Sequence, residues 1–198
     1  MHWRRLHPGL YADVPWRNGG GMTREIALRK SAGDPSHSLW RLSLAQVAQS
    51  GPYSEFPGQM RAQALLAGEG LRLNFADARL IELTQRLKPV VFEGVPAPSA
   101  ELIEGPVQVA NLIWDPVAVQ AQLLTRPLVG AMVLFLPPQT TWVIYLLAGQ
   151  AELRLGERSE LLGQEEGVVL DSDQPQAERA VLSGGGEVIL VKLEAPAG

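Results

Sequence analysis

Hydrophobic and polar residues alternate with a period of two along much of this chain. In the segment MTREIALR, which begins at Met22, and in LWRLSLAQV, which begins at Leu39, most large apolar side chains occupy every second position. Successive side chains of a β-strand point to opposite faces, so this spacing gathers the apolar residues on one face. The pattern predicts β-strands.

Further strand-like segments are separated by turns rich in Gly, Pro and Ser. These segments are AQALLA, LRLNF, PVVF, AMVLFL, TWVIYLLA, AELRL, GVVL and EVILVKL. The 198 residues include 20 Gly and 15 Pro, which leaves little room for long helices. The expected fold is therefore all-β, of the sandwich or barrel type, with few helices.

An internal repeat divides the chain. The segment FPGQMRAQALLAGEGLRL, from Phe56, resembles LPPQTTWVIYLLAGQAELRL, from Leu136, and about 20 residues later LKPVVFEG is echoed by EEGVVLDS. The proline turn, the LLAG motif and the Val-Val segment thus recur in one order at one offset, which indicates a duplicated β-module. We expect two tandem cupin-like barrels, a bicupin, over residues 1–125 and 126–198.

Composition narrows the function classes. The chain is 46% hydrophobic and 19% charged, as a folded soluble protein is, and it has no cysteine for disulfides, thiol nucleophiles or thiolate metal sites. The N-terminal MHWRRLHPG lacks the apolar segment of a secretory signal, and no apolar run could span a bilayer. We expect a cytoplasmic protein without membrane contact.

Charge is unevenly distributed. Residues 1–61 hold eight Lys and Arg against four Asp and Glu, whereas residues 62–198 hold nine against seventeen. The net charge of −4 argues against a nucleic-acid partner. The basic first third is where a small anionic metabolite would bind, unless the imbalance is merely a feature of the surface. A homodimer is left open as the assembly.

Histidines are too few for the usual cupin metal site. The chain has only His2, His7 and His37, and no two of them are spaced as neighbours on one strand face. A site of two histidines and a carboxylate cannot be built from them. We expect no metal and no other cofactor.

A glycine-rich loop is the first candidate for ligand binding. PWRNGGGMTREI contains three consecutive glycines, which are Gly19, Gly20 and Gly21. They form either a tight turn or a nest of backbone N–H groups that binds an anion. Neighbouring side chains could add donors; these are Arg17, Thr23 and Arg24. Asn18 could cap the loop or orient a ligand amide.

Arginines further along offer a charge for an anion. Arg41 and Ser43 share the polar face of their strand, and that face is either solvated or lines the inside of a barrel. Arg61 follows the FPGQM turn at a barrel mouth, and its planar guanidinium suits two-point binding of a carboxylate. We predict that Arg61 is the main anion anchor.

Aromatic and acidic residues complete the candidates. Trp16, Tyr53 and Phe56 form either an apolar wall around a ligand or ordinary packing. A general base, if there is one, has to come from three acids near these motifs. They are Glu25, Glu55 and Glu93.

These motifs together resemble the HutD/Ves family of bicupins. The resemblance runs through PWRNGGGMTREI, WRLSLAQV, SGPYSEFPGQMR, LLAGEGLRL and PVVFEG, and covers most of residues 14–111. The family continues with Gly-Pro-x-x-Asp-x-Asn; here GPVQVAN keeps Asn111 but has Val109 in place of the Asp. The resemblance implies a cytoplasmic, metal-free two-cupin protein. For HutD members it implies a moderating role in histidine utilisation and an intermediate such as formylglutamate as ligand, and for Ves members a stress response.

Three functions follow from these residues. A protein that binds a carboxylated metabolite is favoured, because arginines, amides and glycines hold an anion well but offer no histidine or cysteine for catalysis. A metal-independent isomerase or hydrolase acting on such a metabolite is the alternative. A purely structural or partner-binding protein is the third.

Overall fold

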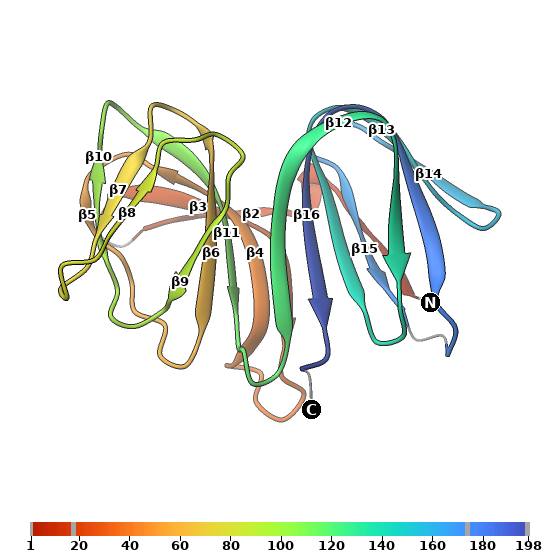
Figure 1. Ribbon diagram of the computed structural model, residues 1–198, viewed down its shortest axis with the longest axis horizontal. Coiled ribbons are helices and arrows are strands. Elements are labelled where there is room, and N and C mark those ends of the chain that lie inside the picture. The colour runs from red at the N-terminus through yellow and green to blue at the C-terminus, as the bar shows by residue number, and fades with distance from the viewer. Residues whose placement is uncertain (1, 17–18, 173–174, 197–198) are drawn as a thin grey trace. The chain divides into compact units, whose positions relative to one another are not determined.

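The computed structural model describes residues 2–16, 19–172 and 175–196. The chain forms two compact units, which we call the N-terminal unit (residues 11–119) and the C-terminal unit (residues 1–10 and 120–198). Both are built of β-strands, and the 3₁₀ segment η1 (Pro8–Leu10) is the only helical element among the described residues (Figure 1). The all-β prediction is confirmed.

The N-terminal unit packs two antiparallel sheets face to face. Its strands are β2 (Ala12–Pro15), β3 (Gly21–Lys30), β4 (Ser38–Val47), β5 (Gly51–Pro52), β6 (Met60–Ala67), β7 (Leu71–Asn74), β8 (Leu80–Leu83), β9 (Val90–Glu93), β10 (Ser99–Leu102) and β11 (Val107–Trp114). One sheet has the order β2-β3-β4-β11-β6-β9 and the other β5-β10-β7-β8. A buried apolar core joins them, with Leu71, Leu73 and Leu83 from the smaller sheet against Leu65 and Phe92 from the larger.

The C-terminal unit is one strongly curved sheet wrapped around its own core. Its strands are β1 (His2–Leu6), β12 (Gln120–Leu136), β13 (Thr141–Leu155), β14 (Arg158–Leu162), β15 (Gly167–Asp171) and β16 (Glu178–Glu194). The order is β1-β15-β13-β16-β12, and β14 also pairs with β13. In Figure 1 the long strands β12 and β16 arch over as they cross the sheet. TWVIYLLA and AELRL, expected as two strands, form the single strand β13.

The domain division differs from the expected 1–125 and 126–198. Strand β12 is continuous from Gln120, so position 125 lies inside a strand, and the N-terminal strand β1 pairs with β15 of the C-terminal unit. Arg5 on β1 forms ion pairs with Glu160 and Glu166 at 2.7 and 3.1 Å. The Gly163 N–H donates to Glu166, and this bond, with the charge of Arg5, holds the pKa of Glu166 below its usual value.

The internal repeat is visible in the strand pairing. In the N-terminal unit, β6 lies between β9 and β11; in the C-terminal unit, β13 lies between β15 and β16. The LLAG segments end in Gly68 and Gly149, whose φ angles of +91° and +92° are nearly the same. The registers make Arg61 equivalent to Trp142, because each pairs with the last apolar residue of its Val-Val strand.

Candidate functional site

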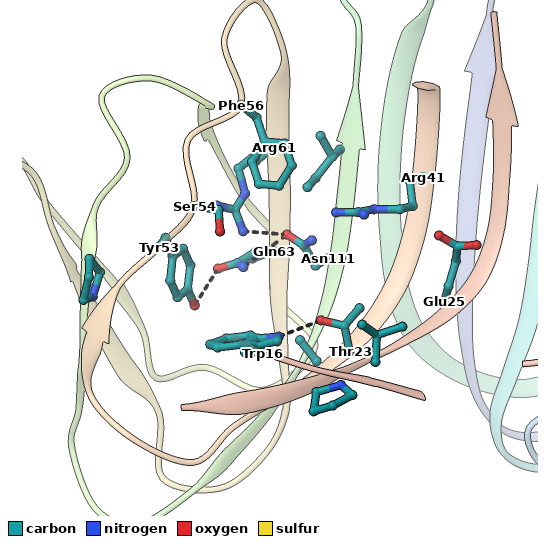
Figure 2. A pocket seen from close by; sticks show the side chains of 15 residues that line it. Trp16, Thr23, Glu25, Arg41, Tyr53, Ser54, Phe56, Arg61, Gln63 and Asn111 are labelled. Atoms are coloured by element: carbon teal, nitrogen blue, oxygen red, sulfur yellow. Dashed lines mark hydrogen bonds between the residues drawn. The ribbon is translucent and has the colours of Figure 1, made fainter. Parts of the chain in front are cut away.

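A cavity of about 570 Å³ opens on the inner face of the larger sheet of the N-terminal unit (Figure 2). Three aromatic side chains line it: Trp16, Tyr53 and Phe56. Polar side chains also line it: Thr23, Glu25, Arg41, Ser54, Arg61, Gln63 and Asn111. Cavities of this size bind small molecules.

Strand register explains why these polar groups meet. Glu25 on β3 lies opposite Ser43 on β4, Ser43 opposite Asn111 on β11, and Asn111 opposite Gln63 on β6. Residues directly opposite one another in a sheet point to the same face. Four polar residues, distant in sequence, therefore form one row across four strands. Of the two alternatives for the strand face that carries Ser43, solvated or inside the barrel, the structure shows the face inside.

Arg61 lies in the next row and is almost fully buried, with 5% of its surface exposed. Its Nη2 donates to Asn111 Oδ1 at 3.1 Å, and Gln63 Nε2 donates to the same oxygen at 3.2 Å. The Nε and Nη1 groups of Arg61 are buried without a hydrogen-bond partner, and no described carboxylate forms an ion pair with it. Burial lowers the pKa of Arg61 to about 10.

Aromatic rings surround the Arg61 guanidinium. Its Cζ lies 4.8 Å from the ring centre of Tyr53 and 5.3 Å from those of Phe56 and Phe92. The segment that carries Tyr53 and Phe56 is fixed at Gly94, whose carbonyl accepts from Phe56 N–H at 3.0 Å and whose N–H donates to the Gln59 carbonyl at 2.8 Å. The rings hold the guanidinium in place but neutralise none of its charge.

A second arginine approaches from β4. Arg41 is half-buried, and its Cζ lies 5.6 Å from the Phe56 ring centre, so both guanidinium groups lie near the same ring. Figure 2 shows the Arg41 side chain extending toward Asn111. Among the described residues Arg41 has no hydrogen bond or ion pair, and its charge also disfavours the charged form of Arg61. Two cationic side chains thus line one cavity, and neither forms an ion pair with a described carboxylate.

The opposite wall is aromatic and neutral. Trp16 Nε1 donates to Thr23 Oγ1 at 2.8 Å, and the Trp16 ring meets Tyr53 edge to face at 6.3 Å between ring centres. The Tyr53 hydroxyl donates to Gln63 Oε1 at 3.5 Å, a weak bond. Burial raises the pKa of Tyr53, although the positive charge of Arg61 opposes that rise.

Gly19, Gly20 and Gly21 are not among the residues that line the cavity. Gly19 N–H donates to the Trp16 carbonyl, and the Gly20 carbonyl accepts from the N–H groups of Ala48 and Gln49. A Cβ on Gly21 would overlap the Gln46 carbonyl oxygen of β4. The described bonds are those of a turn between β2 and β3, and the binding of an anion by the glycines stays a prediction.

Six predicted ligand-binding residues meet at the cavity: Trp16, Thr23, Arg41, Phe56, Arg61 and Asn111. Of the others, Ser43 lies beneath it, fully buried, with its hydroxyl 3.4 Å from the Asn111 carbonyl. Arg24 points elsewhere and binds both carboxylate oxygens of Asp13 on β2. Arg17 and Asn18 lie outside the described residues.

Gln63 and Ser54 are polar cavity residues that sequence reasoning missed. Gln63 was the more readily predictable of the two. Gln63 lies two positions after Arg61 in the run RAQALLA, so strand alternation places both side chains on one face. Of the three candidate bases only Glu25 lines the cavity, since Glu55 is exposed and Glu93 pairs with Arg79 at the surface. Val109, which replaces the family Asp, is fully buried in the apolar core.

The described residues form no cluster of three or more His, Asp or Glu that could hold a metal ion. Within the same ranges, no helix is long enough or apolar enough to cross a membrane.

The C-terminal copy of the β-module has apolar side chains at the positions of the polar cavity residues. In the C-terminal unit the positions of Arg61 and Gln63 are taken by Trp142 and Ile144, and that of Asn111 by Leu190, all packed in an apolar core. The β-module therefore folds around apolar side chains at these positions. The polar cluster of the N-terminal unit is not needed to form the fold.

The HutD family profile matches residues 10–190. A 21.2 kDa protein of the hutC 3′ region of Pseudomonas putida is 32% identical over 151 residues, which cover 74% of this chain and 78% of that protein. The protein Ves of Escherichia fergusonii is 40% identical over 90 residues, 46% of each chain.

Solved structures agree with these sequence matches. HutD from Pseudomonas fluorescens SBW25, in a formate condition, superposes with a TM-score of 0.82 at 27% identity, over 99% of this chain and 100% of that one. Oxalate decarboxylase OxdC of Bacillus subtilis has a TM-score of 0.62 at 8% identity, over 98% of this chain and 77% of that one, and shows the cupin-type fold alone. Since the profile spans nearly the whole chain and a relative is similar over three quarters of it, the chain belongs to the HutD family, as the sequence resemblance predicted.

Proposed function

We propose that this protein binds a small carboxylate-bearing metabolite in the N-terminal cavity, with Arg61 as its anchor. One observation carries the proposal: the Nε and Nη1 nitrogens of the buried Arg61 guanidinium have no hydrogen-bond partner, and no described carboxylate balances its charge. An uncompensated buried charge destabilises a protein by several kcal/mol, roughly 3–5 where a partner has been removed. A ligand carboxylate would supply both the missing charge and the missing acceptors.

The surrounding groups suit the same ligand. Arg41 brings a second positive charge to the cavity. Asn111 uses its Oδ1 to accept from Arg61 and Gln63, so its Nδ2 group remains available as a donor. Trp16 and Phe56 offer apolar surface for a short carbon chain. The ligand would thus be held by charge at one side and by ring contact at the other.

Binding is favoured over catalysis. A catalyst needs a titratable group placed at the reacting atoms, and Glu25 is the only carboxylate among the described cavity residues. The metal-independent isomerase or hydrolase would have to use Glu25 as its base. The arginines and amides of the cavity bind an anion without that assumption.

A regulatory role in histidine utilisation is the biological context we propose. A relative is identified by its place in the hutC 3′ region, and a similar solved structure is HutD itself. A carboxylated intermediate such as formylglutamate would then be sensed or buffered by the protein, without a metal and in the cytoplasm. The similarity to Ves makes a stress response the alternative context.

A thermal-shift and calorimetry screen tests the proposal. The probes are formylglutamate, urocanate, glutamate, histidine, glutarate and formate. At one hundred times its dissociation constant, a bound probe stabilises the fold by about 2.7 kcal/mol, so at least one carboxylate should raise the melting temperature. Arg61→Lys keeps the charge but loses the planar fork, so it should weaken binding, and Arg61→Ala should weaken it further.

Arg154→Ala is the matched control, because Arg154 is exposed and pairs with Glu152 in the C-terminal unit. It should bind the same probe as tightly as the parent. The proposal fails if no carboxylate raises the melting temperature, or if Arg61→Ala binds the probe as tightly as the parent does.

A further inference from the structure

Glu25 places a negative charge inside a cavity that otherwise suits an anion. Its carboxyl group is half-buried and lines the cavity. It has no hydrogen bond and no ion pair with any described residue. A site for simple carboxylates would gain nothing from this group, because it repels them.

The strand register fixes where Glu25 stands relative to the anchor. Glu25 and Gln63 end the polar row that crosses β3, β4, β11 and β6, with Ser43 and Asn111 between them. Neighbouring strands are separated by about 4.8 Å, so Glu25 lies roughly 10 Å from Asn111 across two strands. The cavity therefore has cationic donors at its β6–β11 side and an acceptor at its β3 side.

The residues next to Glu25 form no hydrogen bond or ion pair with its carboxylate. Ser43, directly opposite, turns its hydroxyl to the Asn111 carbonyl instead. Arg41 belongs to the adjacent row and extends toward Asn111, and it forms no ion pair with Glu25 (Figure 2). The Thr23 hydroxyl accepts from Trp16. An acceptor is thus left facing the cavity.

We infer that the ligand carries an N–H donor, an ammonium or an amide N–H, in addition to its carboxylate, and that Glu25 selects for it. The inference rests on the proposed function, since the carboxylate is held by Arg61. Ligands of this class are amino acids and N-acylated amino acids. The three charged cavity residues Arg41, Arg61 and Glu25 carry a net charge of +1, which an amino dicarboxylate complements group by group.

Matched pairs of probes test the inference by calorimetry on the full chain. The pairs are glutarate with glutamate, succinate with aspartate, and glutarate with N-formylglutamate; the first two pairs differ by an ammonium group and the third by a formamido group. A hydrogen bond from a donor to a charged group is typically strong enough to change affinity roughly tenfold or more. In at least one pair the nitrogen-bearing member should bind about tenfold tighter. Preference for glutamate would identify an ammonium group, and preference for N-formylglutamate an amide.

The variant Glu25→Gln should affect the two classes of ligand differently. It removes a negative charge at almost constant shape, so glutarate should bind as tightly as before or tighter, while the nitrogen-bearing partner should lose its advantage. Glu55→Gln is the control, because Glu55 is exposed and does not line the cavity; it should leave every affinity unchanged.

The inference is overturned if no nitrogen-bearing probe binds tighter than its partner, or if Glu25→Gln leaves the preference intact. If either result is found but glutarate still binds and its binding depends on Arg61, the proposed function stands and only the role of Glu25 is lost. Failure of every carboxylate to bind would remove the proposed function as well.

Discussion

Replacing Arg61 by methionine separates a binding role from a structural one. Methionine keeps an unbranched side chain of similar length among the aromatic rings and removes the guanidinium group. Burial lowers the pKa of Arg61 to about 10. Each pKa unit corresponds to roughly 1.4 kcal/mol, so burial destabilises the charged form in the unliganded protein by about 3 kcal/mol. The variant is free of this penalty.

The substitution also removes favourable contacts. The hydrogen bond to Asn111 contributes roughly 1 kcal/mol, and Asn111 keeps its bond from Gln63. Contact of the guanidinium with the three aromatic rings contributes roughly 0.5–1 kcal/mol per ring, part of which the methionine sulfur recovers. The stability lost with these contacts is nearly equal to the stability gained by removing the burial penalty. The free energy of unfolding without ligand should therefore change by less than about 1 kcal/mol.

Urea unfolding followed by tryptophan fluorescence measures both roles. A carboxylate at one hundred times its dissociation constant should stabilise the parent by about 2.7 kcal/mol and the Arg61→Met variant not at all. Arg154→Met should behave as the parent does. Truncating one member of a compensated buried ion pair lowers stability by roughly 3–5 kcal/mol. A fall of that size in unliganded Arg61→Met would refute the reasoning, because it would make the arginine a structural residue.

Four further changes have defined outcomes. Adding Gln63→Ile and Asn111→Leu to Arg61→Met copies the apolar core of the C-terminal unit, so calorimetry should find no carboxylate binding and urea unfolding should find stability equal to the parent or up to about 4 kcal/mol higher. Gly21→Ala forces a Cβ into a neighbouring carbonyl oxygen; it should lower the free energy of unfolding by more than about 1 kcal/mol, while the folded fraction still binds. The lowered pKa of Glu166 adds stability that is complete above about pH 5 and lost as the pH falls through the folded-state pKa, so urea unfolding at several pH values should show a shallower acid loss for Glu166→Gln. Dialysis against EDTA should leave the melting temperature unchanged, and about one equivalent of iron, zinc or manganese by elemental analysis would contradict a metal-free protein.

Strands, fold class and part of the site could be predicted from the sequence. Apolar residues at every second position indicate that a segment is extended and that its two faces differ. That information is local, and it located β3, β4, β6 and β13 to within a few residues, apart from the joining of two predicted strands into β13. The duplication of the β-module was likewise readable, because each copy repeats its turn and its Leu-Leu-Ala-Gly hairpin.

Only the tertiary structure decided which residues meet. The partner of β1 is β15, more than 160 residues away, and nothing in HWRRL distinguishes that partner from any other strand. The row of Glu25, Ser43, Asn111 and Gln63 likewise depends on which strands are neighbours and in which register. Register is set by long-range pairing, so it cannot be read from any one strand.

The tertiary structure also determined which face of each strand points inward. Arg41 and Ser43 alternate with Trp40, Leu42 and Leu44, a pattern that usually places the polar side in water. In this protein the three apolar residues are buried and the polar side lines a cavity. Alternation tells a strand's two faces apart, but polar residues look alike whether they meet solvent or the inside of a barrel, because both surroundings can hydrate or bind them.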